Sequence, residues 1–147
     1  MPWVNPIINR TQADVDYADA HRGNLTENKG ARSHWTLQRI ADNMRYIRAQ
    51  LIERGINVPE ILSRDTWLKT DIPRQSEIEL IQTDIQMLRD LGYIKSTTPF
   101  VPVLPWTHYE KLNDIERILY DTVVIITGIG AANRFSGTFF SGQEGLR

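Results

Sequence analysis

Three stretches of the chain repeat one pattern of apolar residues at helical spacing. Offsets of three, seven and ten residues keep side chains on one face of an α-helix that has 3.6 residues per turn. The pattern is carried by Leu37, Ile40, Met44 and Ile47, by Ile78, Ile81, Ile85 and Leu88, and by Leu112, Ile115, Ile118, Leu119 and Val123. The repetition predicts three amphipathic helices that bury these stripes against one another.

Capping residues and glycines predict where the helices begin and end. The first long helix is expected to begin near Ser33 and to run to Arg54. Capping boxes, in which a hydroxyl and a carboxylate satisfy free amides at a helix start, predict two further starts, at Ser76 with Glu79 and at Thr107 with Glu110. A short early helix is expected to begin at Thr11, whose hydroxyl is followed three residues later by Asp14. The expected stops are Gly23, Gly55 and Gly92.

The stretch DTVVIITGIGAANRFSG, residues 121–137, allows two interpretations. A β-branched run that enters Gly128 and Gly130 is typical of the phosphate loop in a dinucleotide-binding domain. However, Asn133 stands where that motif has its third glycine, and the sequence reaches Arg147 without room for the crossover helix and second strand. We therefore predict that the run is the end of the third long helix, which Gly128 and Gly130 terminate. A helix that is apolar on every side needs cover, for which a neighbouring subunit is the natural source.

The fold class predicted from these patterns is mainly α. We expect a small bundle of three to four helices, with proline-rich connectors and an extended or short β C-terminal arm. Residues 1–132 would form the helical domain, including an extended N-terminal segment, and residues 133–147 the docking arm. The arm alternates polar and aromatic residues around glycines, and an unpaired strand of this kind is a template for pairing with another chain.

Composition excludes several classes of function. The formal net charge of -1 gives no clustered basic surface, so we expect no nucleic-acid partner. The absence of cysteine excludes disulfides, zinc–thiolate sites and thiol catalysis, and suits a reducing compartment. The start of the sequence has no secretory signal pattern. The longest apolar run, from Ile118 to Ile129, is shorter than the roughly 20 residues that span a bilayer, so no membrane partner is expected.

Candidate catalytic and metal-binding residues do not form a recognisable site. The histidines lie far apart in the sequence, at His21, His34 and His108. The acidic pairs Asp14/Asp16 and Asp114/Glu116 are two residues apart, so their side chains do not face each other on a helix. We interpret both pairs as solvated faces, and no serine lies in a Gly-x-Ser-x-Gly motif. The sequence therefore predicts a protein that is not an enzyme and has no cofactor or metal.

The aromatic residues indicate possible contacts. Trp35, Trp67 and Trp106 are expected to lock connectors onto the helical core, because tryptophan buries a large area at little entropic cost. The alternative is a platform that stacks on a sugar or a partner protein. Trp3, close to the N-terminus, is a candidate for insertion into a neighbour. The predicted partner-binding residues are Trp3, Val124, Ile125, Ile126, Phe135, Phe139 and Phe140.

Several ordered motifs resemble a family of small proteins from tailed phages and prophages of Gram-positive bacteria. The motifs are NRTQADVDYA, WTLQRIADNMRYI, DIPRQSEIELIQTDIQMLRDL, YEKLNDIERIL and RFSGTFFSGQEG, which together span nearly the whole chain. The family often has an asparagine in each helix; Asn43 and Asn113 match this feature, whereas the second long helix has Asp84.

The resemblance implies a non-enzymatic structural subunit of a tail or baseplate, made in the host cytoplasm and located in the virion. Its partners would be other tail or baseplate subunits, in a homo- or hetero-oligomer. The alternative is a carbohydrate- or receptor-binding module at the tail tip that contacts a host cell-surface glycan. That alternative would place Trp3, Trp67 and Phe100 together in an exposed groove, whereas a structural subunit would pack them against helices or neighbours.

Overall fold

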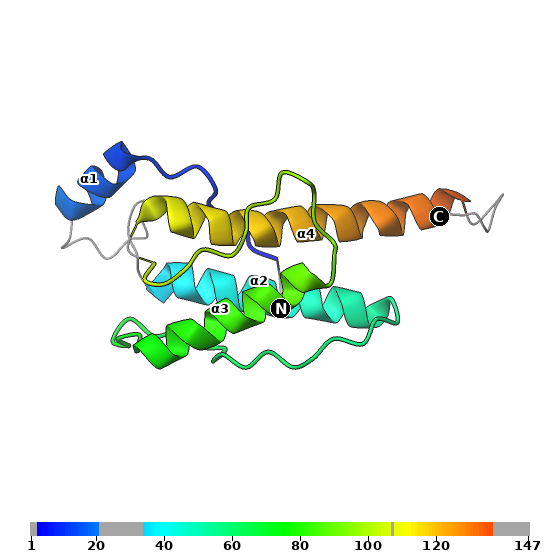
Figure 1. The fold of residues 1–147 in the computed structure, drawn as a ribbon, viewed down its shortest axis with the longest axis horizontal. Coiled ribbons are helices and arrows are strands. Elements are labelled where there is room, and N and C mark those ends of the chain that lie inside the picture. The colour runs from blue at the N-terminus through cyan, green and yellow to red at the C-terminus, as the bar shows by residue number, and fades with distance from the viewer. Residues whose placement is uncertain (1–2, 21–33, 107, 137–147) are drawn as a thin grey trace.

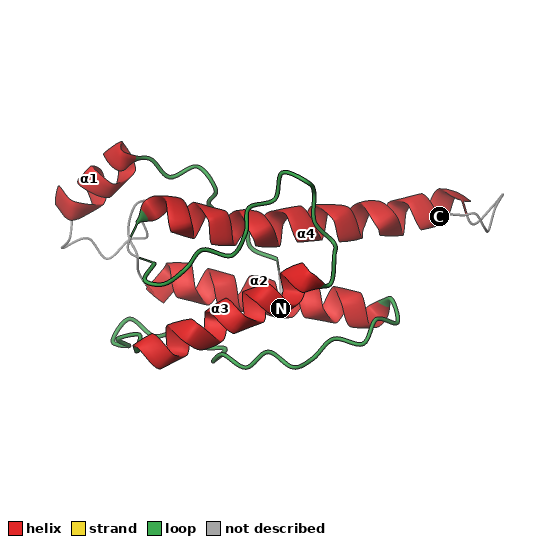
Figure 2. Ribbon diagram, in the orientation of Figure 1, coloured by secondary structure: helices red, strands yellow, loops and turns green. Residues whose placement is uncertain are grey.

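The computed structural model of this chain describes residues 3–20, 34–106 and 108–136, with side chains as far as residue 128. The regular structure of these residues consists of four α-helices. The helices are α1 (Gln12–Ala20), α2 (His34–Glu53), α3 (Gln75–Asp90) and α4 (Tyr109–Ser136). No strand occurs within these ranges (Figures 1 and 2). The prediction of a mainly α-helical fold is confirmed, whereas an arm beyond residue 136 lies outside the described residues.

Helices α2, α3 and α4 pack pairwise around one core, and α1 lies apart from them at one end (Figure 1). The predicted apolar stripes form this core. Ile47, Ile85 and Ile115, one from each helix, are fully buried. The buried apolar side chains in the core are Ile40, Ala41, Met44, Ile47, Leu51, Val58, Trp67, Ile81, Ile85, Leu88, Trp106, Leu112, Ile115, Ile118, Leu119, Val123 and Ile126.

Three of the predicted helix ends are confirmed, at Thr11, Gly55 and Gly92. At the start of α1, the Asp14 N–H donates to Thr11 Oγ1 at 3.3 Å, and the Thr11 N–H donates to the Asp14 carboxylate at 2.9 Å. Gly55 and Gly92 follow α2 and α3 with φ angles of 82° and 89°, a left-handed conformation that costs glycine little. Residues Gly23, Ser33 and Thr107, three further predicted ends, lie outside the described residues.

The predicted start of α3 at Ser76 is wrong, because the helix begins at Gln75 with Arg74 as its N-cap. The Arg74 N–H donates to Glu77 Oε1 at 3.0 Å, so Glu77 takes the capping role that the sequence pattern assigned to Glu79. Arg64 from the preceding connector also donates to Glu77, at 2.9 Å. This contact from outside the helix favours Glu77 over Glu79 as the capping residue. A local capping pattern considers only neighbours in the sequence, so it does not predict this contact.

The prediction that Gly128 and Gly130 end the last helix is also wrong. Helix α4 passes through both glycines and continues to Ser136, so residues 133–136 of the predicted arm are helical. A glycine ends a helix when it adopts a left-handed conformation, but within a helix it costs only about 1 kcal/mol relative to alanine. The end of α4 extends beyond α2 and α3 (Figure 1).

The core can be tested with one substitution made at two isoleucines. Ile81 is 1% exposed, and Ile72, in the connector before α3, is 84% exposed. Ile81→Ala should lower the free energy of unfolding by about 2 to 5 kcal/mol, through lost burial and the cavity that remains. Ile72→Ala should leave it within about 0.5 kcal/mol of wild type. Urea unfolding followed by circular dichroism measures both, and equal losses for the two variants would contradict the assigned core.

Candidate interaction surface

Asparagine side chains on two helices hold the extended N-terminal segment. Asn43 of α2 accepts the Val4 N–H at 2.9 Å and donates to the Val4 carbonyl at 2.8 Å. Asn113 of α4 accepts the Arg10 N–H at 3.0 Å and donates to the Arg10 carbonyl at 3.1 Å. Each amide offers the donor and the acceptor that a neighbouring strand would offer. The segment is therefore fixed without a β-sheet.

Asp84 of α3 plays the same part for the connector between α2 and α3. Its carboxylate accepts the N–H groups of Leu62 at 2.8 Å and Ser63 at 2.9 Å, and the Ser63 hydroxyl at 2.6 Å. Asp84 is 1% exposed, so all these bonds lie in the interior. Asp84 thus binds a connector, because its carboxylate accepts bonds from two successive N–H groups and a hydroxyl.

The connector between α3 and α4 is held in turn by α3 and α4. Arg89 donates to the carbonyls of Pro99 at 2.9 Å and Thr98 at 3.3 Å. The Thr98 hydroxyl donates to Asp121 of α4 at 2.6 Å, and Gln82 donates to the Pro102 carbonyl at 3.2 Å. Polar side chains on the helices therefore replace the backbone partners that these extended segments lack.

A buried ionic network connects the N-terminal segment, α2 and α4. The carboxylate of Glu116 accepts from Arg10 at 2.5 Å and from Arg39 at 2.6 and 3.1 Å, and it also accepts the Ile7 N–H at 3.3 Å. The Glu116 side chain is 1% exposed, so the expectation that the pair Asp114/Glu116 is a solvated face is wrong for Glu116. That expectation considered only neighbours on the same helix, whereas these partners come from distant parts of the chain.

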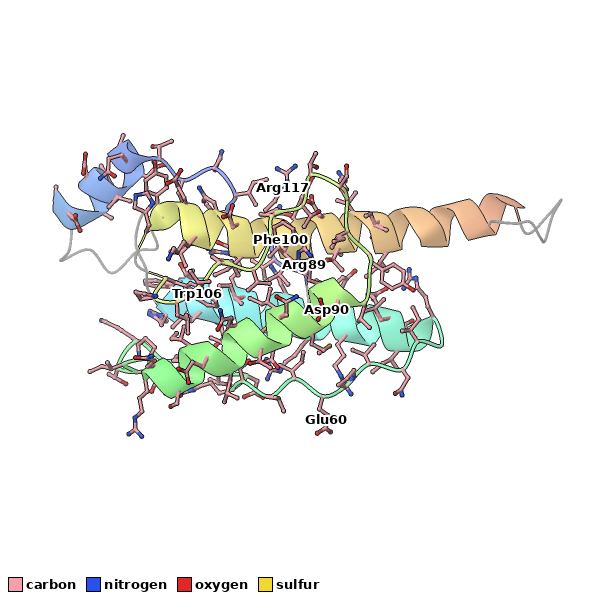
Figure 3. The ribbon with its side chains drawn as sticks, in the orientation of Figure 1. Glu60, Arg89, Asp90, Phe100, Trp106 and Arg117 are labelled. Carbon is pink, nitrogen blue, oxygen red and sulfur yellow. The ribbon has the colours of Figure 1, made fainter. Side chains whose placement is uncertain are left out.

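Several apolar side chains on the connectors remain exposed. Phe100 is 81% exposed and Val103 is 70% exposed, although the connector that carries them is fixed by the bonds described above. The Arg89 guanidinium lies 4.5 Å from the centre of the Phe100 ring, and the two side chains lie side by side in Figure 3. The connector before α3 carries exposed Leu62, Leu68 and Ile72. These segments present apolar groups in fixed positions.

The predicted partner-binding residues are not brought together. Trp3 is half-buried, packs against the core and has its ring centre 5.6 Å from that of Tyr46. Ile126 is 1% exposed, so it belongs to the core and is not available to a partner in this structure. Val124 is 38% exposed, and Ile125 is half-buried beside it. Phe135 lies on α4, and its side chain is not described; Phe139 and Phe140 lie outside the described residues.

The tryptophans support the core interpretation. Trp67 and Trp106 are 3% and 6% exposed, and the Trp106 indole N–H donates to the Pro102 carbonyl at 3.0 Å. Trp35 is half-buried, and its ring lies 4.1 Å from that of His34. The prediction that tryptophans lock connectors onto the core is confirmed for Trp67 and Trp106. Because Trp67 is buried, it does not share an exposed groove with Trp3 and Phe100.

One surface depression is lined by charged side chains that form ion pairs with one another. It is lined by Arg64, Thr70, Asp71, Ile72, Arg74, Ser76 and Glu77. Arg64 donates to Asp71 at 2.8 Å and to Glu77 at 2.9 Å. Backbone N–H groups of Leu68 and Arg74 lower the pKa of Asp71 and of Glu77 respectively, and Arg64 lowers both further. The cluster fixes the start of α3.

The remaining titratable groups are scattered. Burial raises the pKa of Asp114, and the charge of Glu110 raises it further. Because a raised carboxyl pKa disfavours ionisation in the folded state, the charged Asp114 side chain opposes folding near neutral pH and ceases to do so in acid. The His108 Nδ1 atom lies 3.1 Å from Glu110 Oε1.

Within the described ranges, no group of three or more histidine, aspartate or glutamate side chains could hold a metal ion.

Comparison of the chain with protein-family models, curated proteins and solved structures finds no match. In the part of the chain that the structure describes, no helix combines the length and the apolar character needed to cross a bilayer.

Glu116 provides a test of the buried network. Glu116→Ala leaves the cations of Arg10 and Arg39 without their shared anion, so it should lower the free energy of unfolding by about 3 to 5 kcal/mol. Glu110 lies on the same helix, but its side chain is 70% exposed. Glu110→Ala should therefore lower the free energy of unfolding by well under about 1 kcal/mol. Denaturant unfolding compares the two, and a similar small effect for both variants would show that the network contributes nothing to stability.

The asparagine contacts make a local prediction. In Asn43→Ala, the Val4 amide loses its acceptor, so its hydrogen exchange should accelerate by at least about fivefold, as expected for the loss of about 1 to 3 kcal/mol of protection. Gln86→Ala, at an exposed position of α3, is the control and should leave Val4 exchange unchanged. Unaltered Val4 exchange in Asn43→Ala would mean that Asn43 does not hold the segment.

Proposed function

We propose that this protein is a non-enzymatic structural subunit of a phage tail or baseplate, or of a phage-tail-like particle. It docks to neighbouring subunits through the end of α4 and through residues 137–147. The resemblance of five ordered sequence motifs to small phage proteins supports the assignment to a particle. Two of the residues that carry it, Asn43 and Asn113, hold the N-terminal segment against the helices, which gives the shared pattern a physical reason.

The projecting end of α4 is the observation that carries the proposal. Ile126 is the last buried side chain described, and the helix continues for ten residues to Ser136, a length of about 15 Å. Residues 122–133 contain no ionisable side chain. A short helical end that contains two glycines and a single charged residue, Arg134, has little intrinsic stability in water, so packing against another subunit is the natural source of its order.

The fixed connectors are a second support. Asp84, Glu116 and Asp121 are buried, and each accepts hydrogen bonds from its own chain. These acidic groups therefore serve the architecture, and the segments that they hold form a surface of defined shape. A subunit with a preorganised surface loses less entropy when it assembles than a flexible one does.

The carbohydrate-binding alternative gains less support. A sugar platform needs aromatic faces that are exposed together, and Trp67 is buried while Trp3 packs near Tyr46. Phe100 is the exposed aromatic side chain that remains from the predicted set, and Arg89 already lies against its ring. We therefore favour contacts between subunits over contacts with a glycan.

Removal of residues 137–147 tests the proposal. The truncated chain keeps all of α4 and the core, so its melting temperature should stay within a few degrees of wild type, whereas its incorporation into particles should fall below detection. The assay supplies wild-type or truncated protein in trans to a phage that lacks this gene, and then measures its amount in purified particles. Normal incorporation of the truncated chain would refute the role of these residues, and an unfolded truncated chain would place them in the core.

A further inference from the structure

Residues 3–11 form an extended strap that lies across α2 and α4, and the apolar core is complete without it. Among the described residues, every buried side chain of that core belongs to residue 40 or to a later residue, and Trp3 packs against the core as a half-buried neighbour. The strap leads into α1, whose buried side chain is Ala18 and which lies apart from the other helices (Figure 1). A segment with few buried apolar contacts opens at a lower free energy than the whole fold. The N-terminal strap can therefore leave α2 and α4 while these helices stay folded.

Three side chains on α2 and α4 recognise the N-terminal strap. Asn43 binds both backbone groups of Val4, and Asn113 binds both backbone groups of Arg10. Such bonds suit any residue in extended conformation, because they involve its backbone alone. Selection comes from Glu116, whose buried carboxylate accepts from the Arg10 guanidinium. We call these three side chains the strap site. Its ligand is an extended peptide that presents an arginine at the spacing from Val4 to Arg10.

The strap site keeps its charges compensated when the strap leaves. Arg39 of α2 donates to the Glu116 carboxylate at 2.6 and 3.1 Å, so this anion retains a cation after Arg10 has moved into water. Loss of one partner from a buried ion pair is costly when it leaves a buried charge uncompensated, and the second arginine avoids that outcome. Asn43 and Asn113 exchange their bonds to the strap for bonds to water. An empty strap site is therefore a state that the folded chain can reach.

We propose that the strap site accepts the N-terminal strap of a second copy of this chain in place of its own. The occupant follows from the bonds described above, because a second copy presents Val4 and Arg10 at the same spacing and offers every group that the site binds within one chain. Exchange of an identical element between copies is a low-cost route to assembly. The same bonds form after the exchange, so the surface around the site keeps its shape.

The length of the chain permits this exchange. Residues 21–33 connect α1 to α2, and a stretch of this length can span at most about 45 Å. The strap and α1 can thus reach a neighbouring copy without any change in α2, α3 or α4. The chain's own strap competes at an effective concentration in the millimolar range, as expected for a short tether. Exchange should therefore be rare in dilute solution and favoured where copies are held together.

The full-length variant Arg10→Glu gives the first test. The substitution places an anion beside Glu116, so the strap should leave its site, and hydrogen exchange of the Val4 amide should accelerate at least about tenfold. Circular dichroism should show that the helices stay folded, because the core lies elsewhere. Loss of the helical signal would mean that the core needs the strap, and unchanged Val4 exchange would mean that Glu116 does not select the arginine. Either result overturns the inference.

A mixture of two full-length variants tests the exchange itself. Arg10→Glu has an intact strap site and a defective strap, whereas the double variant Asn43→Ala and Asn113→Ala has a defective site and an intact strap. Light scattering should show that each is monomeric alone and that the mixture forms a complex of one copy of each. Addition of Arg10→Glu to the double variant is the matched control, since it removes the last intact strap and should abolish the complex. A mixture that stays monomeric, or a complex that survives in the control, would overturn the inference.

A synthetic peptide of residues 1–11 tests the recognition by the strap site. Fluorescence anisotropy should show that the labelled peptide binds the Arg10→Glu chain at least about tenfold more tightly than the wild-type chain, whose own strap competes. The same peptide with Arg10→Glu should bind at least about tenfold more weakly. Equal affinities of the two peptides would contradict the assigned ligand. The inference concerns a surface other than the end of α4, so it does not depend on the proposed particle role or on the assay with the truncated chain.

Discussion

The carboxylate of Glu116 joins three parts of the chain that are distant in sequence. It lies in α4 and binds Arg39 of α2 and Arg10 of the N-terminal segment, with side chains that are at most 5% exposed. Removal of these charges from water is costly, so such a network is not by itself a source of large net stability. Its consequence is geometric, because the cations remain compensated only when the N-terminal segment lies across α2 and α4 in this register.

The same constraint explains the rest of the architecture. Three helices supply the apolar core, but long extended segments run along them without a sheet that could satisfy their backbone groups. Asn43, Asp84 and Asn113 provide donors and acceptors from the helices instead. The protein is therefore a small helical core with fixed irregular segments on its surface. This arrangement supports the proposed role of a subunit whose surface is preorganised before it meets its neighbours.

The core was predictable from the sequence, whereas the polar network was not. The positions of Ile40, Ile81 and Ile115 follow from helical periodicity, which is a local property of the chain. The burial of Glu116 depends on partners 77 and 106 residues away, so no local pattern reveals it. The predicted end of α4 at Gly128 and Gly130 is wrong for a related reason. Glycine disfavours a helix only slightly, and the packing of Val123 and Ile126 against the core outweighs this effect of glycine as far as Gly128. Of the predicted contact residues, Val124 remains exposed and Ile126 does not.

The amount of this protein in purified particles tests the proposed role most directly. Quantitative mass spectrometry of phage particles, or of phage-tail-like particles, from a host that carries the gene measures its copy number relative to the major tail protein. A structural subunit should be present at a constant ratio that survives density-gradient purification and washing with high salt. Abundant protein in the lysate together with its absence from particles, or a ratio that falls with each wash, would contradict the proposed function.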